Sequence, residues 1–387
     1  MLGALSMSAS PPLLIVHVVH HLVIGGMENG MVNLINRLPH DRFRHVVVCI
    51  EDSSDFARRI ERADVEVISL HRSKVGIWKM RWRLFRLLQR LRPNIVHSRN
   101  LSGLDALLPA RLSGIVSGLR TLHSEHGFDV ADLRGAATKP ALLRRLHAPL
   151  VHRYVCVSQD LGRLMVEQWG LSAGRVRQIY NGVDTDRFVP TQPRPQALLP
   201  AELLGDGLFI IGAVGRVRPI KDQATLLRAF ARLLDRRPDW RARLRLALIG
   251  DGPQLPELQA LAASLGISAQ CWFSGARDDV AALMQSLDLF VLPSLNEGIS
   301  NTLLEAMSTG LPVVATAVGG NVELMDEGVI GASFAPGDHS HLAAIIESYV
   351  ADASLCLRHG AAARERAVNH FSLQAMVANY QEVYESL

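Results

Sequence analysis

Short runs of hydrophobic, β-branched residues alternate along the chain with longer segments in which hydrophobic residues recur at helical spacing. Up to residue 180 the runs are LLIVHVV, HVVVCI, NIVHS, LRTLH, RYVCVS and VRQIY. After residue 207 the pattern starts again with LFIIGAVGR, LRLALIG, QCWFSG, DLFVLPS and PVVATA. Such runs are typical of parallel strands buried on both faces, and the helical segments between them predict βαβ units. We therefore predict an α/β protein with two Rossmann-like domains.

The segment DRFVPTQPRPQALLPAELLGDG (residues 186–207) separates the two series of strands. It is rich in Pro and Gly and lacks strand periodicity, which indicates a linker. We place an N-terminal domain at residues 1–190 and a C-terminal domain at residues 208–371. Residues 372–387 predict a helix capped by Ser372, which we expect to pack back on the N-terminal domain. Ligands of open α/β sheets bind beyond the carboxyl ends of the strands, so two such domains predict a central cleft.

Composition narrows the class of protein. With 48% hydrophobic and 20% charged residues the chain should fold throughout. A net charge of +4 and a pI of about 9.0 favour anionic ligands or an anionic surface, and we expect no nucleic-acid partner. Four cysteines without CxxC spacing indicate neither a disulfide framework nor a zinc site and fit a reducing cytoplasm. The apolar start LLIVHVVHHLVIGGM lacks the basic region of a signal peptide, and no run of about 18 apolar residues predicts a membrane-spanning helix.

Two carboxylates flank a predicted junction between loop and helix in LPSLNEGISNTLLEAMSTGLPVVATAVGG. Glu297 precedes a helical pattern over Asn301–Thr309, and Glu305 lies about one turn inside it. A helix N-terminus suits a phosphate, and a nearby carboxylate can accept hydrogen bonds from sugar hydroxyls. The motif therefore favours a sugar nucleotide. The spacing alone is also compatible with a solvated loop acid and a surface helix residue.

Two further motifs add phosphate-binding chemistry. In GRVRPIKD, a predicted strand ends before Arg216 and Lys221. The arginine can donate to two phosphate oxygens of a diphosphate at once, and the lysine adds a point charge. In GGMEN, Gly25 and Gly26 follow the first strand and allow the backbone to approach a phosphate closely. Taken alone, the cations also fit a solvated surface and the glycines a simple turn.

The stretch NEGISNTLLEAMSTGLPVVAT closely resembles the donor-site signature of the retaining GT-B glycosyltransferases of family 4, also called glycosyl transferases group 1. Further landmarks occur in the same order: GGMEN, TLH, VCVSQDL, IYNGVDTDRF, GAVGRVRPIKD, LIGDGP, FSG and DLFVLPS. The resemblance covers nearly the whole chain. More narrowly, the chain is similar to bacterial sugar transferases of exopolysaccharide and exosortase-associated gene clusters. It departs from the commonest pattern at Ile299–Ser300, where an aromatic residue and Gly are frequent, so the donor sugar stays open.

The resemblance implies a role for each residue of this site. Glu305 binds the ribose hydroxyls of the nucleotide, and Glu297 binds hydroxyls of the donor sugar. Arg216 and Lys221 hold the diphosphate and stabilise it as the leaving group. Backbone N–H groups contact the diphosphate from Gly298, Ile299, Ser300 and Asn301 of one domain and from Gly25 and Gly26 of the other.

The resemblance also implies a histidine that faces the reacting sugar from the first domain. His123, at the end of LRTLH, matches it, and His126 and Glu125 in the following SEHG are competitors. The implied reaction retains the anomeric configuration by same-face substitution, without a metal or a cofactor beyond the nucleotide-sugar. The implied catalytic set is His123, Arg216, Lys221 and Glu297.

Other functions are less well supported. A Rossmann dehydrogenase is disfavoured because GAVGRV lacks the G-x-G-x-x-G spacing. A sugar-nucleotide epimerase of the same fold and a non-catalytic nucleotide-sugar-binding protein remain alternatives. The leading prediction is transfer of a sugar from a nucleoside-diphosphate sugar to a lipid-linked or saccharide acceptor in exopolysaccharide, lipopolysaccharide or other envelope-glycan synthesis.

Residues 72–92, RSKVGIWKMRWRLFRLLQRLR, contain eight basic residues and no acid. On a helical wheel four of the basic residues (Lys79, Arg83, Arg86 and Arg90) share one stripe, apolar residues lie opposite, and Trp78, Trp82 and Phe85 form a flank. An ordinary helix that covers a sheet fits this pattern. An interfacial helix at an anionic membrane fits it as well, and would make the protein peripheral at the inner face of the cell membrane.

Overall fold

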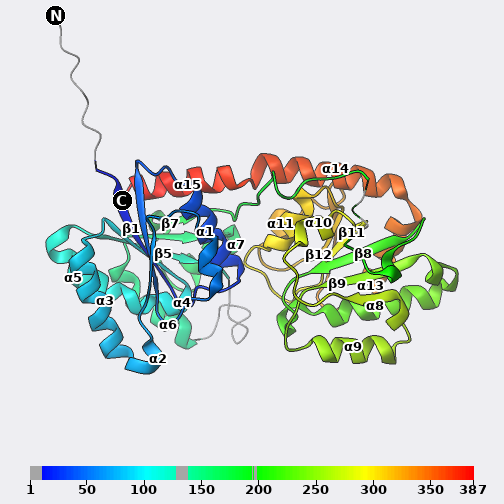
Figure 1. Ribbon diagram of the computed structural model, residues 1–387, viewed down its shortest axis with the longest axis horizontal. Helices are drawn as coiled ribbons and strands as arrows, with labels where there is room; N and C mark the ends of the chain where they lie inside the picture. The colour runs from blue at the N-terminus through cyan, green and yellow to red at the C-terminus, as the bar shows by residue number, and fades with distance from the viewer. Residues whose placement is uncertain (1–10, 128–137, 194, 196–197) are drawn as a thin grey trace, which may run out of the picture.

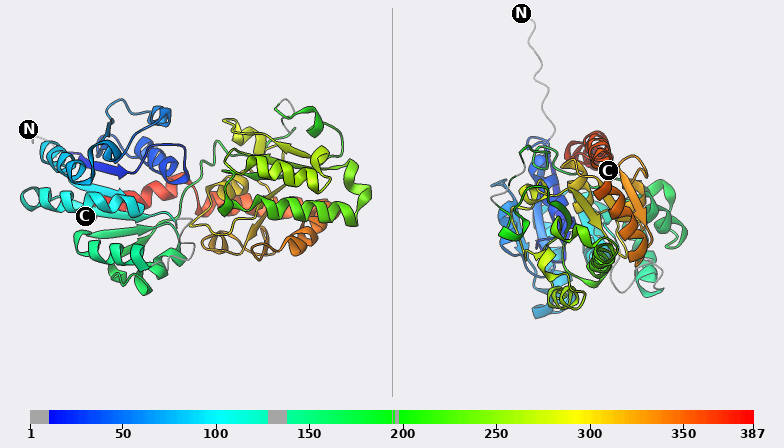
Figure 2. Two further views of the ribbon diagram at one scale, coloured as in Figure 1. Left: turned by 90° about the horizontal axis from the view of Figure 1, so that it is seen from below. Right: turned by 90° about the vertical axis from the view of Figure 1, so that its right-hand side faces the viewer.

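The structure is a computed structural model that describes residues 11–127, 138–193, 195 and 198–387. Two domains lie side by side, each with a parallel β-sheet between layers of helices (Figure 1). This confirms the predicted α/β class and the two Rossmann-like sheets. The view from below shows the same two bodies, with the C-terminal helices, drawn in orange and red, passing between them (Figure 2, left).

Within its described residues, domain 1 has seven parallel strands in the order β3-β2-β1-β4-β5-β6-β7. The elements are β1 Leu13–Val19, α1 Gly26–Arg37, β2 Phe43–Cys49, β3 Glu66–Ser69, α2 Arg72–Val75, α3 Ile77–Leu91, β4 Ile95–Arg99, α4 Asn100–Gly103, α5 Leu107–Ser117, β5 Arg120–Glu125, α6 Thr138–His147, β6 Arg153–Cys156, α7 Gln159–Glu167 and β7 Val176–Gln178.

The described part of domain 2 has six parallel strands in the order β10-β9-β8-β11-β12-β13. The elements are β8 Phe209–Val214, α8 Gln223–Arg236, β9 Leu244–Ile249, α9 Leu255–Ser264, β10 Cys271–Phe273, α10 Val280–Met284, β11 Leu289–Leu292, α11 Asn301–Ser308, β12 Val313–Thr316, α12 Asn321–Leu324, β13 Gly331–Phe334, α13 His339–Ala351 and α14 Ala353–His370.

Alternation along the central strands assigns side chains to the two faces of each sheet. In β1, Ile15 packs with residues of α1 and of the C-terminal helix α15 (Leu373–Glu385), whereas Val16 and Val18 pack with α3 and α5 on the other face. Successive strand residues point to opposite faces. The two hydrophobic faces explain why these strands read as nearly continuous apolar runs.

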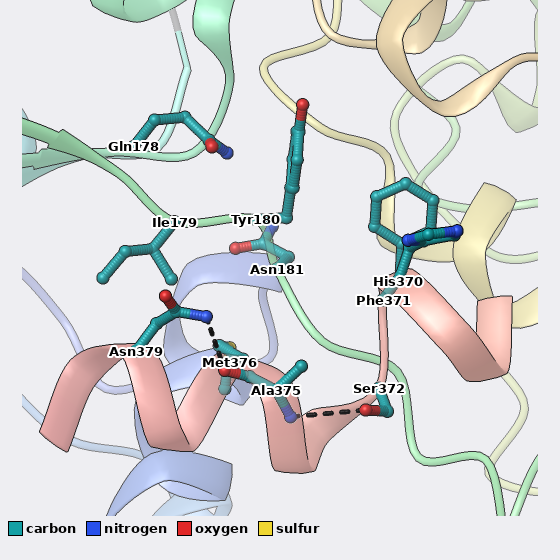
Figure 3. A pocket seen from close by; sticks show the side chains of 10 residues that line it. All are labelled: Gln178, Ile179, Tyr180, Asn181, His370, Phe371, Ser372, Ala375, Met376 and Asn379. Atoms are coloured by element: carbon teal, nitrogen blue, oxygen red, sulfur yellow. Dashed lines mark hydrogen bonds between the residues drawn. The ribbon is translucent and has the colours of Figure 1, made fainter. Parts of the chain in front are cut away.

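The chain passes between the domains twice, once after β7 and once between α14 and α15. The two passages touch: the N–H of Val183 donates to Phe371 O at 2.8 Å, and the N–H of Leu373 donates to Val183 O at 3.0 Å. A Cβ on Gly182 would lie 2.7 Å from Leu373 Cα, so this approach needs glycine. Figure 3 shows a small pocket lined by residues of both crossings. The Ser372 hydroxyl accepts a hydrogen bond from Ala375 N there, at the start of α15.

Residues 72–92 form two helices, because the chain breaks at Gly76, which has a left-handed φ of 79°. Met80, Leu84, Leu87 and Leu88 of α3 pack into the core of domain 1. The tryptophans of α3 point away from it. No helix in the described residues is both long and apolar enough to cross a membrane.

Candidate functional site

The loop between β11 and α11 (residues 293–300) carries the first predicted carboxylate. The Ser300 hydroxyl accepts from the N–H of Leu303 at 3.3 Å and caps α11, which begins at Asn301 as the sequence predicts. In the described part of the chain, the backbone N–H groups of residues 298–301 have no hydrogen-bond partner. Free donors at the positive end of a helix are chemically suited to an anion.

Glu297 and Lys221 come together at the carboxyl edge of the sheet of domain 2. Lys221 Nζ lies 2.5 Å from Glu297 Oε1, and the Ser294 hydroxyl donates to the same oxygen at 2.7 Å. The side chains of the pair are only 19% and 10% exposed. Lys221 follows β8 and Glu297 follows β11, and these two strands are neighbours in the sheet. Two residues 76 positions apart thus share one site because parallel strands end at one edge.

Glu305 lies in the second turn of α11. Its carboxylate has no hydrogen bond and no ion pair among the described residues. Burial raises the pKa of Glu305 to about 7, although the charges of Arg187 and Arg59 act against the rise. A buried carboxylate without a hydrogen-bond partner lowers the stability of the free protein when it ionises. Its oxygens are available to accept hydrogen bonds from the hydroxyls of a ligand.

Arg216 is exposed at the edge of domain 2, after β8. Burial raises the pKa of Glu28, in the first turn of α1, and the charge of Arg216 opposes that rise. The positive charge of Arg216, in domain 2, therefore acts on the Glu28 carboxylate, in domain 1. Within the described residues no carboxylate forms an ion pair with Arg216, so its guanidinium is available to an anion.

Gly25 and Gly26 meet α11 from the other domain. Asn301 Nδ2 donates to the carbonyl of Gly26 at 3.2 Å, and Asn181 Nδ2 donates to Asn301 Oδ1 at 2.8 Å. A Cβ on Gly26 would lie 3.0 Å from Asn301 Nδ2. The GGMEN loop and the loop after β11 are thus already in contact in this structure.

Gly298 forms a second contact between the domains. A Cβ at this position would lie 2.7 Å from the carbonyl oxygen of His126 and 2.9 Å from Gly127 Cα. On its other side the loop rests on Gly319 and Gly320, where a Cβ would collide with the carbonyls of Glu297 and Gly298. The pair stands in AVGG, directly after β12, and was not among the predicted site residues.

The structure separates the two candidate histidines. His123 is 1% exposed, and both its ring nitrogens have protein partners: Ser98 Oγ at 2.8 Å and Glu125 Oε1 at 3.3 Å. His126 instead has its backbone against Gly298, and its ring lines a small cavity between the domains. The role of His123 toward the sugar stays a prediction, and the geometry places His126 nearer the loop after β11.

Glu125 contacts the His123 ring on the face of the sheet that α6 covers. Arg144 of α6 donates to Glu125 Oε1 at 2.7 Å. Burial alone raises the pKa of Glu125, but hydrogen bonding from His123 and the charge of Arg144 outweigh it and lower the pKa to about 2. The Arg144 guanidinium also lies 4.0 Å from the ring centroid of Trp169. All four side chains of this network are buried in domain 1.

Glu323 was also absent from the predicted site residues. From α12 of domain 2 it accepts the backbone N–H groups of Gln159 and Asp160 at 2.8 Å each, at the start of α7 in domain 1. The Tyr180 hydroxyl donates to it at 3.0 Å. A carboxylate at a helix N-terminus is favourable, so Glu323 joins the domains electrostatically.

We call Gly25, Gly26, Arg216, Lys221, residues 297–301 and Glu305 the inter-domain site. It combines two cations, free backbone donors and two carboxylates. Across the described ranges of the chain, no group of three or more His, Cys, Asp or Glu side chains is placed to hold a metal ion. This set of groups is suited to a ligand with both phosphates and sugar hydroxyls.

Comparisons with known proteins place this geometry in a family. Residues 24–187 match the model of glycosyltransferase family 4, and residues 198–366 match that of glycosyl transferases group 1. The Bacillus subtilis protein EpsD, named as a glycosyltransferase, is 30% identical over 299 residues, which cover 76% of each chain. An Escherichia coli α-1,3-galactosyltransferase named for GlcNAc-diphosphoundecaprenol is 25% identical over 79% of this chain and 80% of its own.

A D-inositol 3-phosphate glycosyltransferase of Streptomyces avermitilis is 33% identical over 210 residues, which make up 52% of this chain. The alignment spans about half the length of that relative, 45% of it. Among solved structures, HepE of Anabaena in complex with UDP aligns with a TM-score of 0.80 at 21% identity, over 97% of this chain and all of that one. At this identity the likeness shows the fold.

Two facing Rossmann-like domains of this kind define the GT-B fold. The chain belongs to the glycosyltransferases of family 4, as the quoted motifs predict.

Proposed function

We propose that this chain transfers a sugar from a nucleoside-diphosphate sugar to an acceptor hydroxyl at the inter-domain site, with retention of the anomeric configuration. The observation that carries the proposal is Glu305, a carboxylate whose pKa burial raises to about 7 and which has no partner in the described structure. The ribose of a nucleotide offers two adjacent hydroxyls to such a group. The free N–H groups of residues 298–301 lie on the same helix start and suit the diphosphate.

The reaction breaks the bond between the anomeric carbon and the diphosphate oxygen and forms a bond to the acceptor oxygen on the same face. The proton of the acceptor hydroxyl passes to the departing phosphate. Negative charge grows on the diphosphate as it leaves, and Arg216 and Lys221 are placed to stabilise it. Glu297 exchanges its contact with Lys221 for the sugar hydroxyls. Because two cations and the start of α11 meet this charge, we propose that the reaction needs no metal.

The donor is tested first by binding. A thermal-shift screen with UDP, GDP, ADP, NAD and NADP, in EDTA, is run on the native chain and on Arg216→Ala and Glu305→Ala. A ligand at 100 times its Kd stabilises the protein by about 2.7 kcal/mol. We expect UDP to stabilise, because HepE is solved with UDP and with UDP-glucose, and we expect both variants to lose the effect. Glu257→Ala, at an exposed position on α9, is the matched control.

Catalysis is then followed by acceptor-dependent release of the nucleoside diphosphate, with the anomeric configuration of the product read by NMR. Interconversion of the donor sugar without acceptor would instead favour an epimerase. Stabilisation by NAD or NADP alone, or full binding in both variants, would refute the assignment of the inter-domain site. Loss of activity in EDTA that Mg²⁺ restores would contradict the metal-free mechanism.

For the acceptor we propose a lipid-linked saccharide reached at an anionic membrane surface. On α3, Trp78 and Trp82 are 75% and 58% exposed. Arg81 and Arg86 lie over these rings, at 5.3 and 5.8 Å from the ring centroids. Exposed tryptophans among cations suit the headgroup region of a bilayer, and each cation near anionic lipid contributes about 1 kcal/mol. The name of the Escherichia coli relative includes a diphosphoundecaprenol-linked sugar, which supports this choice.

The membrane proposal is tested by co-sedimentation with phosphatidylcholine vesicles, with and without phosphatidylglycerol, at low salt. We expect binding only to the anionic vesicles and its loss in a double variant, Trp78→Ala with Trp82→Ala. The control is Leu357→Ala, another exposed apolar position, on α14 of domain 2. Equal binding to both vesicle types, or binding unaffected by the double variant, would contradict it.

A further inference from the structure

Two loops of domain 2 are bonded to each other beside the inter-domain site. One is the loop between β11 and α11 (residues 293–300), which we call the donor loop, and the other follows β12. The N–H of Gly320 donates to the Glu297 carbonyl at 3.1 Å, and the Thr316 hydroxyl donates to the Ser294 carbonyl at 2.5 Å. The two loops therefore form one unit, and α12 begins directly after Gly320.

Helix α12 is also fixed to the body of domain 2. Arg366 of α14 donates to the carbonyls of Leu324 and Glu323 at 2.8 and 3.1 Å. The side chains of Asn321 and Leu324 are fully buried. A helix of four residues that is held at both ends has little freedom of its own. Glu323 therefore keeps a set position relative to the donor loop.

The carboxylate of Glu323 meets domain 1 and the chain crossings between the domains. Its Oε2 accepts from the N–H of Gln159 and from the Tyr180 hydroxyl, and its Oε1 accepts from the N–H of Asp160. Burial and the charge of Glu323 raise the pKa of Tyr180, so its hydroxyl keeps the proton that it donates. The Tyr180 ring packs edge to face against Phe371 of the second crossing, with 5.3 Å between the ring centroids (Figure 3).

Helix α7 has a cap of its own, which separates the role of Glu323 from the formation of this helix. The Ser158 hydroxyl accepts from the N–H of Leu161 at 3.2 Å. The N–H groups of Gln159 and Asp160 have no acceptor within α7, because they belong to its first turn. Glu323 of the other domain accepts both. The contact therefore acts mainly on the position of one domain against the other.

We propose that Glu323 is a positioning residue for sugar transfer, which links the donor loop of domain 2 to α7 of domain 1 through α12. A nucleotide bound at the donor loop then strengthens the contact of Glu323 with α7, and the contact strengthens nucleotide binding by the same factor. The use of this link in transfer rests on the proposed function. An acceptor held by domain 1 must meet the anomeric carbon within a fraction of an ångström, so a loosened contact lowers the rate of transfer.

Amide hydrogen exchange reads the contact directly, because the amides of Gln159 and Asp160 are its donors. We expect Glu323→Ala to speed exchange at these two amides about tenfold, the effect of one lost helix cap, and Glu323→Gln to speed it less. Exchange of Leu161, which has its own cap, should change less than that of its neighbours. Glu365→Ala, at an exposed position on α14, is the control. Unchanged exchange of both amides in Glu323→Ala overturns the proposal, and Glu323→Gln gives the same test if the alanine variant fails to fold.

Adding UDP tests the link to the donor loop. Saturating UDP should slow exchange of the Gln159 and Asp160 amides about fivefold in the native chain and leave it unchanged in Glu323→Ala. Glu323→Ala should weaken UDP binding in calorimetry by the same factor, about fivefold, because the coupling is reciprocal. Protection of residues 298–301 by UDP without any change at α7 would overturn the link. Equal protection of α7 in the native chain and in Glu323→Ala would overturn the role of Glu323 in it.

Steady-state kinetics test the use of the link in transfer. We expect kcat of Glu323→Ala to fall about tenfold or more, a larger change than that in UDP affinity, and Glu323→Gln to recover part of it. A native kcat with only the KM for the donor raised would contradict the positioning role. A native chain that neither binds UDP nor transfers sugar, but shows faster exchange at α7 in Glu323→Ala, would reject the proposed function and keep the contact between the domains. The two failures are therefore distinguishable.

Discussion

Replacing Glu305 by glutamine separates the cost of burying this carboxylate from its use in binding. Burial raises its pKa from 4.5 in the unfolded chain to about 7 in the folded protein, against the opposing charges of Arg187 and Arg59. The folded state therefore binds the proton more tightly than the unfolded state. The stability that protonated Glu305 contributes is fully present below about pH 4.5 and is lost as the pH rises to about 7.

The size of the effect follows from the pKa. A rise from 4.5 to about 7 corresponds to about 3 kcal/mol of unfolding free energy between acid and alkaline pH. Glutamine has nearly the same shape and cannot ionise, so Glu305→Gln avoids this loss. For a domain of this size, 1 kcal/mol shifts Tm by about 2–4 °C, so Tm of the variant should exceed the native Tm by about 6–12 °C at alkaline pH.

The assay is thermal unfolding of the native chain and Glu305→Gln from about pH 5 to about pH 8.5, with Glu257→Gln as the exposed control in the same domain. The difference in Tm between native chain and variant should be small at the acid end, grow through neutral pH and then level off. UDP should stabilise the variant less than the native chain, so stability and binding move in opposite directions. A difference that does not change with pH would refute the reasoning, because the destabilisation is then not due to ionisation.

Three further substitutions test individual contacts of the site. Lys221→Ala leaves Glu297 without its 2.5 Å partner and removes a cation from the leaving group, so kcat should fall about 100-fold or more in a nucleotide-release assay; an unchanged kcat would contradict that role. Gly298→Ala places a Cβ 2.7 Å from the carbonyl of His126, so activity should fall while Tm changes little. Full activity of this variant would show that catalysis does not need the two domains to approach this closely. Glu323→Gln weakens the capping of α7 and should lower stability by about 1 kcal/mol in urea unfolding, with small-angle scattering showing more open domains; unaltered scattering would mean that other contacts hold the domains together.

Much of the fold could be read from local pattern. The buried runs became strands of two parallel sheets, and the helix predicted to start at Asn301 starts there, because strand burial and helix capping depend on neighbouring residues. The sequence also predicted that Lys221 and Glu297 both follow strands of one sheet and belong to one site, although their direct contact was not predicted. Such features need no knowledge of how distant parts of the chain meet.

Other features were decided by the tertiary structure. Residues 72–92 read as one helix, yet Gly76 divides them, because a left-handed residue there turns the chain onto the core. His123 and His126 are equally plausible in TLHSEHG, and their faces differ only because alternation along β5 sends 123 toward α6 and 126 toward α1 and α15.

The contacts between the domains belong to the same class. Glu323 of α12 caps the start of α7, and Gly298 lies against His126; both contacts join residues more than 160 positions apart. Burial, helix capping and the donor-site motifs follow from local periodicity and side-chain chemistry, so the amino-acid pattern is enough to predict them. Which buried polar groups find partners, and which are left open to a ligand, depends instead on where two separately folded sheets meet.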